Sequence, residues 1–518
     1  MQYAGTILDE GGAVLNVKSP LWGAAGDGVA DDTAEIQAAV NACPPGGTVF
    51  VPAGVYLIEG TDPVDGAGGI KLKSNMTFQM APGATLKIAP TSSEAYAGLR
   101  IWNATDIHVI GGRILGERGQ HVGSTGEWGH GVDIRDGHRI NITDVIADEC
   151  WGDGFYVGTL NNALFSSEIS MLNVRATHNR RSGLALISAK QVRIIDGRFF
   201  DTEGTAPQGG IIMEPDGGGV FNEDVLVSGC HFGGNAYDIY VWAGARNIVL
   251  AGNTLRGHGG IMISDRVTNM TVVGNVVETS GTTSQTSALM TVAGTATPIN
   301  GLRVTGNTFA GGNQVVVDMS SGDAGGLHNV EFSDNTVISE VNGGRLVRVI
   351  SPGVRLTDNR FVVRGAGGID ATSPDDWTVL LHGVTHAGNV FYRNETTAKN
   401  VYASLQNTRL LGDDDYVGIK RGWNGPTGRH SNILGGSVSS GGGIASGSTV
   451  SIPVTGVDAT TARIAVLAMG GGENGGDPGG VTWHVTSRTI SGFTLVIKNV
   501  SGVTQSLVGD WVALLPFG

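Results

Sequence analysis

Three carboxylates in the middle of the chain stand at comparable places beside short apolar segments. Asp153 lies in CWGDG, and Glu214 and Asp216 lie in IIMEPDG. Converging carboxyl groups can share acid–base work, because a protonated one donates to a leaving group while an ionised one activates water. We therefore expect Asp153 and Glu214 to act as a hydrolytic pair with Asp216 in support. Plainer alternatives exist, since Asp153 and Asp216 can be turn formers and Glu214 a solvated side chain.

Other polar and aromatic residues recur near these acids and are candidates for substrate binding. They are Glu127, Trp128, His130, Asp133, Tyr156, Arg181, Tyr240 and Trp242. Outward aromatic rings offer flat apolar platforms with polar edges, and a guanidinium binds acidic substituents in a bidentate way. Alternatively, the rings pack under a loop or against another subunit, Asp133 pairs with Arg135, and Arg180 and Arg181 offset nearby acids. Residues 117–130, which carry Glu127 to His130, can equally be a structural loop.

The spacing of short strands predicts the element that positions these residues. The segments GVDI, GFYV, GLAL, GIIM, DIYV and GIMI begin at residues 131, 154, 183, 210, 238 and 260, so they recur every 22 to 29 residues. A fixed coil with variable loops on one side explains this pattern, and such loops usually form the binding surface of a repeat protein. A second series, Asn253, Asn275, Asn307, Asn335, Asn359 and Asn389, follows strands such as IVLAGN. We expect these asparagines to stack as turn residues.

Strict alternation in the strands predicts which side chains face inward. The expected internal stack consists of Val132, Ile134, Phe155, Val157, Leu184, Leu186, Ile211, Met213, Ile239, Val241, Ile261 and Ile263. The expected outward set on the same sheet is Asp133, Arg135, Tyr156, Glu214, Tyr240 and Trp242, and the three candidate acids should share one exposed edge.

The remaining segments divide the chain into four parts. Residues 31–42 predict an amphipathic helix with a capping box of Asp32 and Glu35 and an apolar face of Ile36, Ala39 and Val40. The predicted parts are an arm (1–20), a β-helix (21–395), a Gly/Ser-rich linker (396–447) and a small β-sandwich (448–518). The predicted fold class is therefore all-β, a right-handed parallel β-helix with a short capping helix and a C-terminal β-sandwich.

Two consecutive motifs carry a family resemblance. The segment WGAAGDGVADDTAEIQAAV followed by GGTVFVPAGVYLI resembles the opening of the pectate-lyase-like β-helix superfamily, which includes phage tailspikes. HVGSTGEWGHGVDI, CWGDGFYVG and GTAPQGGIIMEPD are similar to its glycosyl-hydrolase-28-related branch, in which Asp153 corresponds in coil position to one of the paired aspartates. The intact polygalacturonase pattern of NTD, paired Asp and His-Gly is not reproduced, and only about twenty residues precede the β-helix.

The resemblance implies a polysaccharide depolymerase that acts outside the cell, on a virion tail or as a secreted protein. It implies an endo-glycosidase, expected to invert because stacked coils place Asp153 and Glu214 about 10 Å apart at the backbone. It also implies a homotrimer and contact with other phage tail proteins. A polysaccharide lyase that uses His130, Tyr156 and Arg181 on a uronic acid is the first alternative. A glycan-binding fibre protein without catalytic activity is the second.

Composition excludes several other partners. A net charge of -14 disfavours nucleic acid and anionic membranes, which reward clustered Lys and Arg. Cys43, Cys150 and Cys230 lack metal-like spacing, and no phosphate loop, nucleophile elbow or zinc motif occurs, so no cofactor or metal is expected. The run Asp413–Asp415 lacks the full ligand series for Ca²⁺ and is interpreted as an exposed linker. The opening MQYAGTILDEGG shows no Sec signal pattern, so export is expected to use another route.

Overall fold

The computed structural model describes most of the chain up to residue 393 and the backbone of strands beyond it. The described ranges are 12–61, 68–160, 165–216, 220–278, 288–294, 297–311, 315–321, 326–339, 345–351, 353–364 and 379–393, together with the later strands named below. The chain divides into two compact units, Met1–Ala403 with Gly412–Arg421, and Ser404–Leu411 with Gly422–Gly518.

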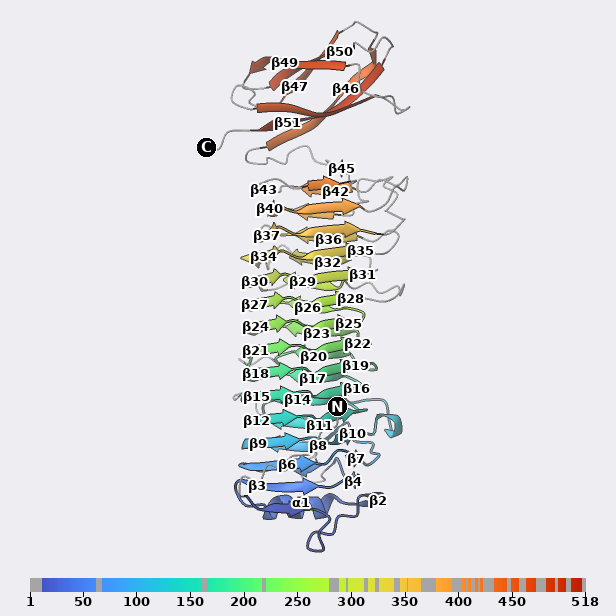
Figure 1. The fold of residues 1–518 in the computed structure, drawn as a ribbon, viewed down its shortest axis with the longest axis vertical. Coiled ribbons are helices and arrows are strands. Elements are labelled where there is room, and N and C mark those ends of the chain that lie inside the picture. Colours follow the sequence, from blue (N-terminus) through green and yellow to red (C-terminus); the bar gives the residue numbers. More distant parts are fainter. Residues whose placement is uncertain are drawn as a thin grey trace. The chain divides into compact units, whose positions relative to one another are not determined.

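The first unit is a solenoid in which each coil adds one strand to each of three parallel sheets (Figure 1). We name these sheets A, B and C in the order in which a coil visits them. Sheet A contains β1 (Val14–Asn16), β3 (Gly47–Val51), β6 (Met76–Met80), β9 (Thr105–Ile110), β12 (His138–Thr143), β15 (Ser166–Leu172), β18 (Ala189–Ile195), β21 (Asn222–Ser228), β24 (Ala245–Ala251), β27 (Thr268–Val273), β30 (Ile299–Thr305), β33 (Leu327–His328), β34 (Val330–Ser333), β37 (Val354–Thr357), β40 (Thr385–Ala387) and β43 (Arg409–Leu410).

Sheet B contains β2 (Asp27–Asp31), β4 (Gly54–Ile58), β7 (Ala84–Ile88), β10 (Arg113–Leu115), β13 (Ile146–Asp148), β16 (Arg175–Thr177), β19 (Arg198–Phe200), β22 (His231–Gly233), β25 (Thr254–Arg256), β28 (Val276–Glu278), β31 (Thr308–Gly311), β35 (Thr336–Ser339), β38 (Arg360–Val363), β41 (Val390–Arg393) and β44 (Asp415–Val417). Sheet C contains β5 (Ile70–Lys71), β8 (Ala95–Trp102), β11 (Trp128–Arg135), β14 (Asp153–Gly158), β17 (Ser182–Leu186), β20 (Gly209–Met213), β23 (Tyr237–Trp242), β26 (Ile261–Ser264), β29 (Met290–Gly294), β32 (Val315–Ser321), β36 (Arg345–Ile350), β39 (Val379–His382), β42 (Tyr402–Gln406) and β45 (Lys420–Gly422).

The recurring segments recognised in the sequence are the strands of sheet C, and their predicted register is confirmed. Val132 pairs with Phe155, Phe155 with Leu184, and the register continues through Ile211 to Ile261. Every residue predicted for the internal stack is completely buried. The predicted fold class, a right-handed parallel β-helix with a capping helix and a C-terminal β-sandwich, is therefore confirmed.

A column of glycines closes the corner where each coil enters sheet C. Its members are Gly98, Gly131, Gly154, Gly183 and Gly210. A Cβ built on any of them would lie 2.6 to 2.8 Å from the carbonyl oxygen of the column residue in the next coil, which no real Cβ contact allows. The next coil has Asp238 at this place, and its carbonyl oxygen faces Gly210. The column thus requires glycine because adjacent backbones approach too closely for any side chain.

The asparagine series forms a buried ladder, which confirms the expected stacking of these residues. In the ladder, Asn275 Oδ1 accepts hydrogen bonds from Asn253 N and Nδ2, both at 2.9 Å, and Asn307 Oδ1 accepts the same pair from Asn275. The left-handed residue is the one before each asparagine, for example Gly252 with φ 64°. The asparagine side chains point inward because each satisfies backbone groups of two coils that water cannot reach.

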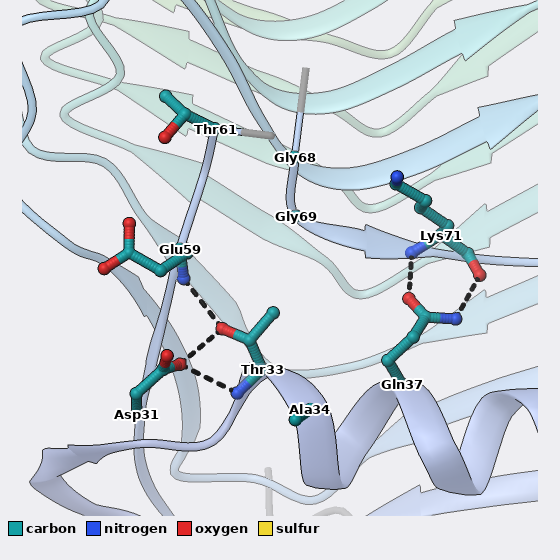
Figure 2. Close-up of a pocket in the computed structure, with 9 residues that line it drawn as sticks. All are labelled: Asp31, Thr33, Ala34, Gln37, Glu59, Thr61, Gly68, Gly69 and Lys71. Atoms are coloured by element: carbon teal, nitrogen blue, oxygen red, sulfur yellow. Dashed lines mark hydrogen bonds between the residues drawn. The ribbon is translucent and has the colours of Figure 1, made fainter. Parts of the chain in front are cut away.

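Helix α1 (Thr33–Ala42) lies at the start of the solenoid (Figure 1). It packs on β5. Its predicted apolar face is confirmed, because Ile36, Ala39 and Val40 are fully buried. The predicted capping box is wrong: the Asp32 carboxylate accepts hydrogen bonds from the amides of residues 25 and 26 and makes no cap bond to the helix. Its function falls to Asp31, whose Oδ1 accepts from the Thr33 amide at 3.0 Å (Figure 2).

A shallow hollow beside α1 fixes the helix to the solenoid. Within it, the Gln37 side chain accepts a hydrogen bond from the Lys71 amide at 2.8 Å and donates one to the Lys71 carbonyl at 3.1 Å (Figure 2). Gln37 thereby mimics a neighbouring strand at the edge of β5. The hollow's polar groups largely bond to one another, which is the signature of a structural cap.

The structure has strands where the sequence suggested a linker. Strands β42 to β45 extend the three sheets beyond residue 395, and the Gly/Ser-rich run lies on β46 (Ile433–Ile444). Residues 422–518 of the second unit contain two three-stranded antiparallel sheets: β46, β51 (Gln505–Leu514) and β48 (Arg463–Gly471), and β47 (Thr449–Thr455), β50 (Gly492–Asn499) and β49 (Val481–Thr489). Asp413 and Asp414 of the acidic run lie outside the described residues, as does most of the predicted arm. Among described residues, no helix is both long and apolar enough to cross a membrane.

Candidate functional site

A single guanidinium gathers the acids on the outer face of sheet C. Arg181, which precedes β17, places Nη2 2.9 Å from Glu214 Oε2, Nε 3.2 Å from Glu127 Oε2, and Nη1 3.4 Å from both oxygens of Asp153. The Arg181 amide donates to the Gly152 carbonyl at 3.0 Å, so this coil is locked to the preceding one. Three carboxylates distant in sequence therefore meet around one cation.

Asp153 lies behind this cation, and the expectation that it stands on an exposed edge is wrong. It is fully buried at the start of β14. Burial raises its pKa to about 6, and the Arg181 charge opposes this shift. Its Oδ2 lies 3.5 Å from Nδ1 of His130. Asp153 is thus a buried carboxyl that contacts Arg181 from the interior side of sheet C.

His130 and Tyr156 form the layer under Asp153 and are also buried. Their rings stack at 4.5 Å with an interplanar angle of 21°. Burial keeps the pKa of His130 well below its usual value, with the Arg135 and Arg181 charges adding to the effect. Burial raises the pKa of the Tyr156 hydroxyl. Neither ring is open to a substrate in this structure, in contrast to the outward, accessible positions that the strand pattern suggested.

Glu214 and Asp216 form the accessible part of the cluster. Glu214 follows β20, and its side chain is 20% exposed. Burial raises its pKa; Arg181 opposes the shift, and the charges of Asp216 and Glu127 reinforce it. Asp216 is exposed, and partial burial raises its pKa while Arg181 and Arg135 lower it. The nearest carboxyl oxygens of Asp153 and Glu214 lie at most about 9 Å apart, because both residues contact one planar guanidinium. A separation within this limit fits both inverting and retaining glycosidases.

The loop that carries Glu127 is fastened by Arg180 and Trp151. Arg180 Nη2 donates to the Ser124 carbonyl at 2.9 Å, and the Arg180 guanidinium lies 3.9 Å from the centre of the Trp151 ring. Trp151 Nε1 donates to the Thr125 carbonyl at 3.0 Å, and His121 stacks on the same ring at 3.7 Å. Arg180 therefore anchors the loop. Arg181 offsets nearby acids, which is one of the two roles that the sequence suggested for it.

Two aromatic rings extend the cluster along the outer face. Tyr240 and Trp242 on β23 lie 6.1 Å apart with nearly parallel planes, 5° from each other. Trp242 is 39% exposed and Val241 is fully buried, so the predicted outward direction of Trp242 is confirmed. Trp128 is also exposed, at the start of β11. Burial raises the pKa of the Tyr240 hydroxyl, and the Glu214 charge adds to the rise.

Sequence reasoning assigned no binding role to a second cationic group on the same sheet, Arg135. Arg135 Nε donates to both oxygens of Asp133, at 2.9 and 3.2 Å, which confirms the plainer alternative for Asp133. The Arg135 guanidinium lies 5.1 Å from the Trp102 ring centre and 4.7 Å from that of Tyr156. Two signals pointed to it, because Arg135 shares the outward parity of Asp133 and pairs in register with Trp102.

The described residues contain no group of three or more His, Cys, Asp and Glu side chains able to hold a metal ion. The three cysteines are free and buried.

Comparison with known families agrees with this architecture. Residues 14–108 match the family model described as rhamnogalacturonase A/epimerase, pectate lyase-like, and residues 97–277 match that of the right-handed β-helix region. The recognition made from the sequence, a pectate-lyase-like right-handed β-helix, is therefore confirmed.

Curated relatives align over parts of the solenoid. The uncharacterized protein YclG of Bacillus subtilis is 29% identical over 252 residues, which are 44% of this chain and 43% of YclG. Mannuronan C5-epimerase AlgE3 of Azotobacter vinelandii is 51% identical over 65 residues, 12% of this chain and 3% of its own. Exo-poly-alpha-D-galacturonosidase of Dickeya chrysanthemi is 41% identical over 73 residues, 14% and 10% respectively. The chain thus spans less than half the length of the curated relatives it matches.

Among solved structures, the fold resembles that of a phage tailspike. The tailspike protein of E. coli bacteriophage HK620, solved in complex with a pentasaccharide, has a TM-score of 0.60 at 13% identity. The superposition covers 97% of this chain and 94% of the tailspike chain. At this identity the likeness concerns the fold.

Proposed function

We propose that the chain is an extracellular polysaccharide depolymerase that hydrolyses internal glycosidic bonds. The observation that carries the proposal is the contact of Glu127, Asp153 and Glu214 with the one guanidinium of Arg181, beside the exposed ring of Trp242. A shared cation keeps carboxylates close together, and burial raises the pKa of two of them, as acid catalysis at a glycosidic oxygen requires. The partly exposed acid and the aromatic platform lie on the same sheet face.

The relatives support the substrate class. Their names include a mannuronan epimerase and a poly-galacturonosidase, and the structural neighbour was solved with a pentasaccharide. All of these proteins act on or hold saccharide chains. A polysaccharide partner is therefore the common expectation, whichever bond is attacked.

In the proposed reaction, Glu214 is the general acid and Asp216 the general base. Glu214 protonates the leaving oxygen as the anomeric C–O bond breaks, and a water activated by Asp216 attacks the anomeric carbon. Asp153, buried behind Arg181, cannot contact a saccharide directly in this arrangement. We therefore assign it a positioning role: it holds Arg181, which in turn holds Glu214. This revises the initial pairing of Asp153 with Glu214 as two direct catalysts.

The decisive experiment is a screen of purified protein against capsular and exopolysaccharides, with product masses as the readout. Hydrolysis adds one water per cleavage, whereas β-elimination adds none and leaves an ultraviolet-absorbing unsaturated sugar. We expect hydrolytic masses. Binding without chain shortening across the panel would instead support a glycan-binding fibre protein.

The lyase alternative has less structural support. Its base and charge-neutralising group were to come from His130, Tyr156 and Arg181. The first two are buried, and Arg181 is already engaged by three carboxylates. Detection of an unsaturated sugar product would support the lyase alternative over hydrolysis.

We further propose a homotrimer on a virion tail, in contact with other tail proteins. The tailspike-like fold and the similarity to a prophage-derived protein of Bacillus subtilis, YorA, which is 27% identical over 209 residues, support this setting. Solenoids expose long flanks that suit side-by-side association. Light scattering should give three times the chain mass, and a stable monomer at micromolar concentration contradicts the proposal.

A further inference from the structure

We propose that Arg135 is an anion-binding subsite that takes the carboxylate of an acidic sugar in the bound polysaccharide. The inference deepens the proposed function and rests on it, because it names the chemical class of the substrate. Three independent features of the described residues support it: how Arg135 is held, which of its edges is free, and where it lies relative to the acids.

Arg135 is held rigidly between rings of the two neighbouring coils. Trp102 on β8 and Tyr156 on β14 flank its guanidinium at 5.1 and 4.7 Å, and Asp133 fixes Nε at 2.9 Å. Stacked strands are about 4.8 Å apart, and the strand that carries Arg135 lies between the strands of the two rings. The guanidinium therefore fills the space between those rings. A cation fixed in this way loses little conformational entropy when it binds a ligand.

One edge of the guanidinium remains open. Nη1 and Nη2 make no hydrogen bond with any residue that the structure describes, and the side chain is 24% exposed. Two parallel N–H groups on a planar edge match the two oxygens of a carboxylate. Asp133 is too buried to turn toward this edge, and it already occupies Nε. The open edge therefore suits a carboxylate from outside the chain.

The subsite lies on the same outward column as the reaction centre. Arg135 pairs in register with Gly158 on β14, and Glu214 lies two coils further, so about three coil steps of 4.8 Å separate Arg135 from Glu214. Burial raises the pKa of Asp216, and the charges of Arg181 and Arg135 both oppose the rise. The Tyr156 ring covers Gly158, since a Cβ built on Gly158 would lie 2.7 Å from Tyr156 Cε1, so a saccharide chain on this column passes over that ring. A saccharide chain along this column reaches both places.

The subsite also resolves a conflict in charge. With a net charge of -14 the protein repels an acidic polymer unless a local cation receives it. Arg100 adds a second guanidinium, 4.3 Å from the Trp102 ring. Asp133 pairs with Arg135 at Nε, and the Asp216 charge also acts on Arg135, so the open edge of Nη1 and Nη2 is the cationic feature of this patch.

The test compares acidic and neutral versions of one ligand. Hexamers of mannuronate, guluronate and galacturonate, and the same hexamers with carboxyls reduced to alcohols, are titrated against the full chain carrying Glu214→Gln. We expect at least one acidic hexamer to bind tighter than its reduced form, by about tenfold or more, and 0.5 M salt to shrink this preference.

Substitutions then locate the preference. Arg135→Gln should abolish it, and Arg303→Gln, which removes an exposed arginine paired with Glu331, should not. Because Arg135→Gln leaves Asp133 buried without its partner, the double variant Asp133→Asn/Arg135→Gln removes both charges and keeps the test valid if the single variant fails to fold. The double variant should also lose the preference.

Two results overturn the subsite: equal binding of acidic and reduced hexamers in all three series, or a preference that survives removal of Arg135. Neither depends on cleavage, which product masses of the unsubstituted protein report separately. A hydrolase for neutral glycans would therefore show no preference for acidic hexamers but would give hydrolytic product masses. A protein that binds acidic glycans without cleaving them would show the preference but no shortened products.

Discussion

Nη2 of Arg181 lies 2.9 Å from Oε2 of Glu214, the shortest contact that this guanidinium makes with an acid among the described residues. The contact orients Glu214, which follows β20 of sheet C and is more accessible than Asp153, another partner of Arg181. It also opposes, without reversing, the rise in the Glu214 pKa that burial causes. The reactivity of Glu214 consequently depends on both its surroundings and its partner.

Glu214→Gln should lower turnover by about 10²- to 10⁴-fold with glycan binding largely retained, because the amide keeps size and hydrogen bonding but transfers no proton. Reducing-end release measures the rate. Glu223→Gln is the matched control, since Glu223 is similarly exposed and paired with Arg246 at 2.7 Å but lies on sheet A. Near-normal turnover of the Glu214 variant means that the acid has been misassigned.

Asp153→Asn should reduce turnover and change the pH profile, since the buried carboxyl positions Arg181 and titrates near pH 6. A purely structural residue would alter rate or stability without moving the profile. Rates measured from pH 4.5 to 8.5 distinguish the two. An unchanged rate together with an unchanged profile removes Asp153 from the mechanism.

Trp242→Ala should weaken glycan binding by about 1–2 kcal/mol with little change in melting temperature, because the ring is an exposed platform. Trp151→Ala provides the contrast, since Trp151 is buried between His121 and Arg180 and its loss should cost about 3–5 kcal/mol of stability. Calorimetry and thermal melts measure both quantities. A large thermal loss with unchanged affinity for Trp242→Ala contradicts the platform.

Asp238 should make the solenoid less stable as pH rises. Burial raises its pKa to about 7, although Asn235 Nδ2 and the Gly257 amide donate to it at 2.9 and 2.7 Å. Its contribution to stability is therefore fully present below about pH 4 and is lost as pH rises through about 7, by something on the order of 4 kcal/mol.

Asp238→Gly, which restores the glycine of the preceding coils, should reduce the fall in melting temperature between pH 4.5 and 8. Asp106→Asn is the control, because Arg139 lowers the pKa of Asp106 and its titration lies below this window. The slope with pH is the readout, so an overall loss of stability in the variant does not affect the comparison. A slope equal to that of the unsubstituted chain refutes the prediction.

Asn307→Ala should destabilise the solenoid by at least about 3 kcal/mol, because it strands several buried groups at about 1–3 kcal/mol each. Asn307 accepts from the Asn275 amide at 2.9 Å and donates to the Val272 carbonyl at 2.9 Å. Asn300→Ala, at an exposed position where the side chain bonds to Asn329 alone among the described residues, should change stability by less than about 0.5 kcal/mol. Thermal melts of the pair decide whether the ladder carries this energy.

The sequence was sufficient for the coil and its interior because both depend on periodicity. Val132 and Ile134 are buried for the reason that alternation supplies, and the same spacing recurs in every coil. The asparagines show where periodicity ends. Their spacing was evident, but whether Asn253 forms the turn or points inward depends on the carbonyl groups of another coil.

The candidate site was predicted as a group of residues and not as a layered arrangement. Alternation gives the direction of a side chain but not what covers it, so Tyr156 was expected at the surface, and Asp153 was placed on an exposed edge at the start of its strand. Gly154 accounts for part of the difference. A Cβ on Gly154 would point to Asn179 in the interior, and Phe155 is also buried, so the alternation is interrupted just after Asp153. Arg135 was noticed only as a partner of Asp133, because its ring neighbours lie on other coils.

The glycine column has a consequence for how such a chain changes length over generations. Since each glycine lies against the carbonyl of the next coil, insertion of one residue before Gly183 would move a side chain into a space that holds only hydrogen. The same slip would turn every later core residue toward solvent. Viable length variants should therefore differ by whole coils, or by residues confined to the loops between strands, and the loops are where descendants of this chain are free to diverge.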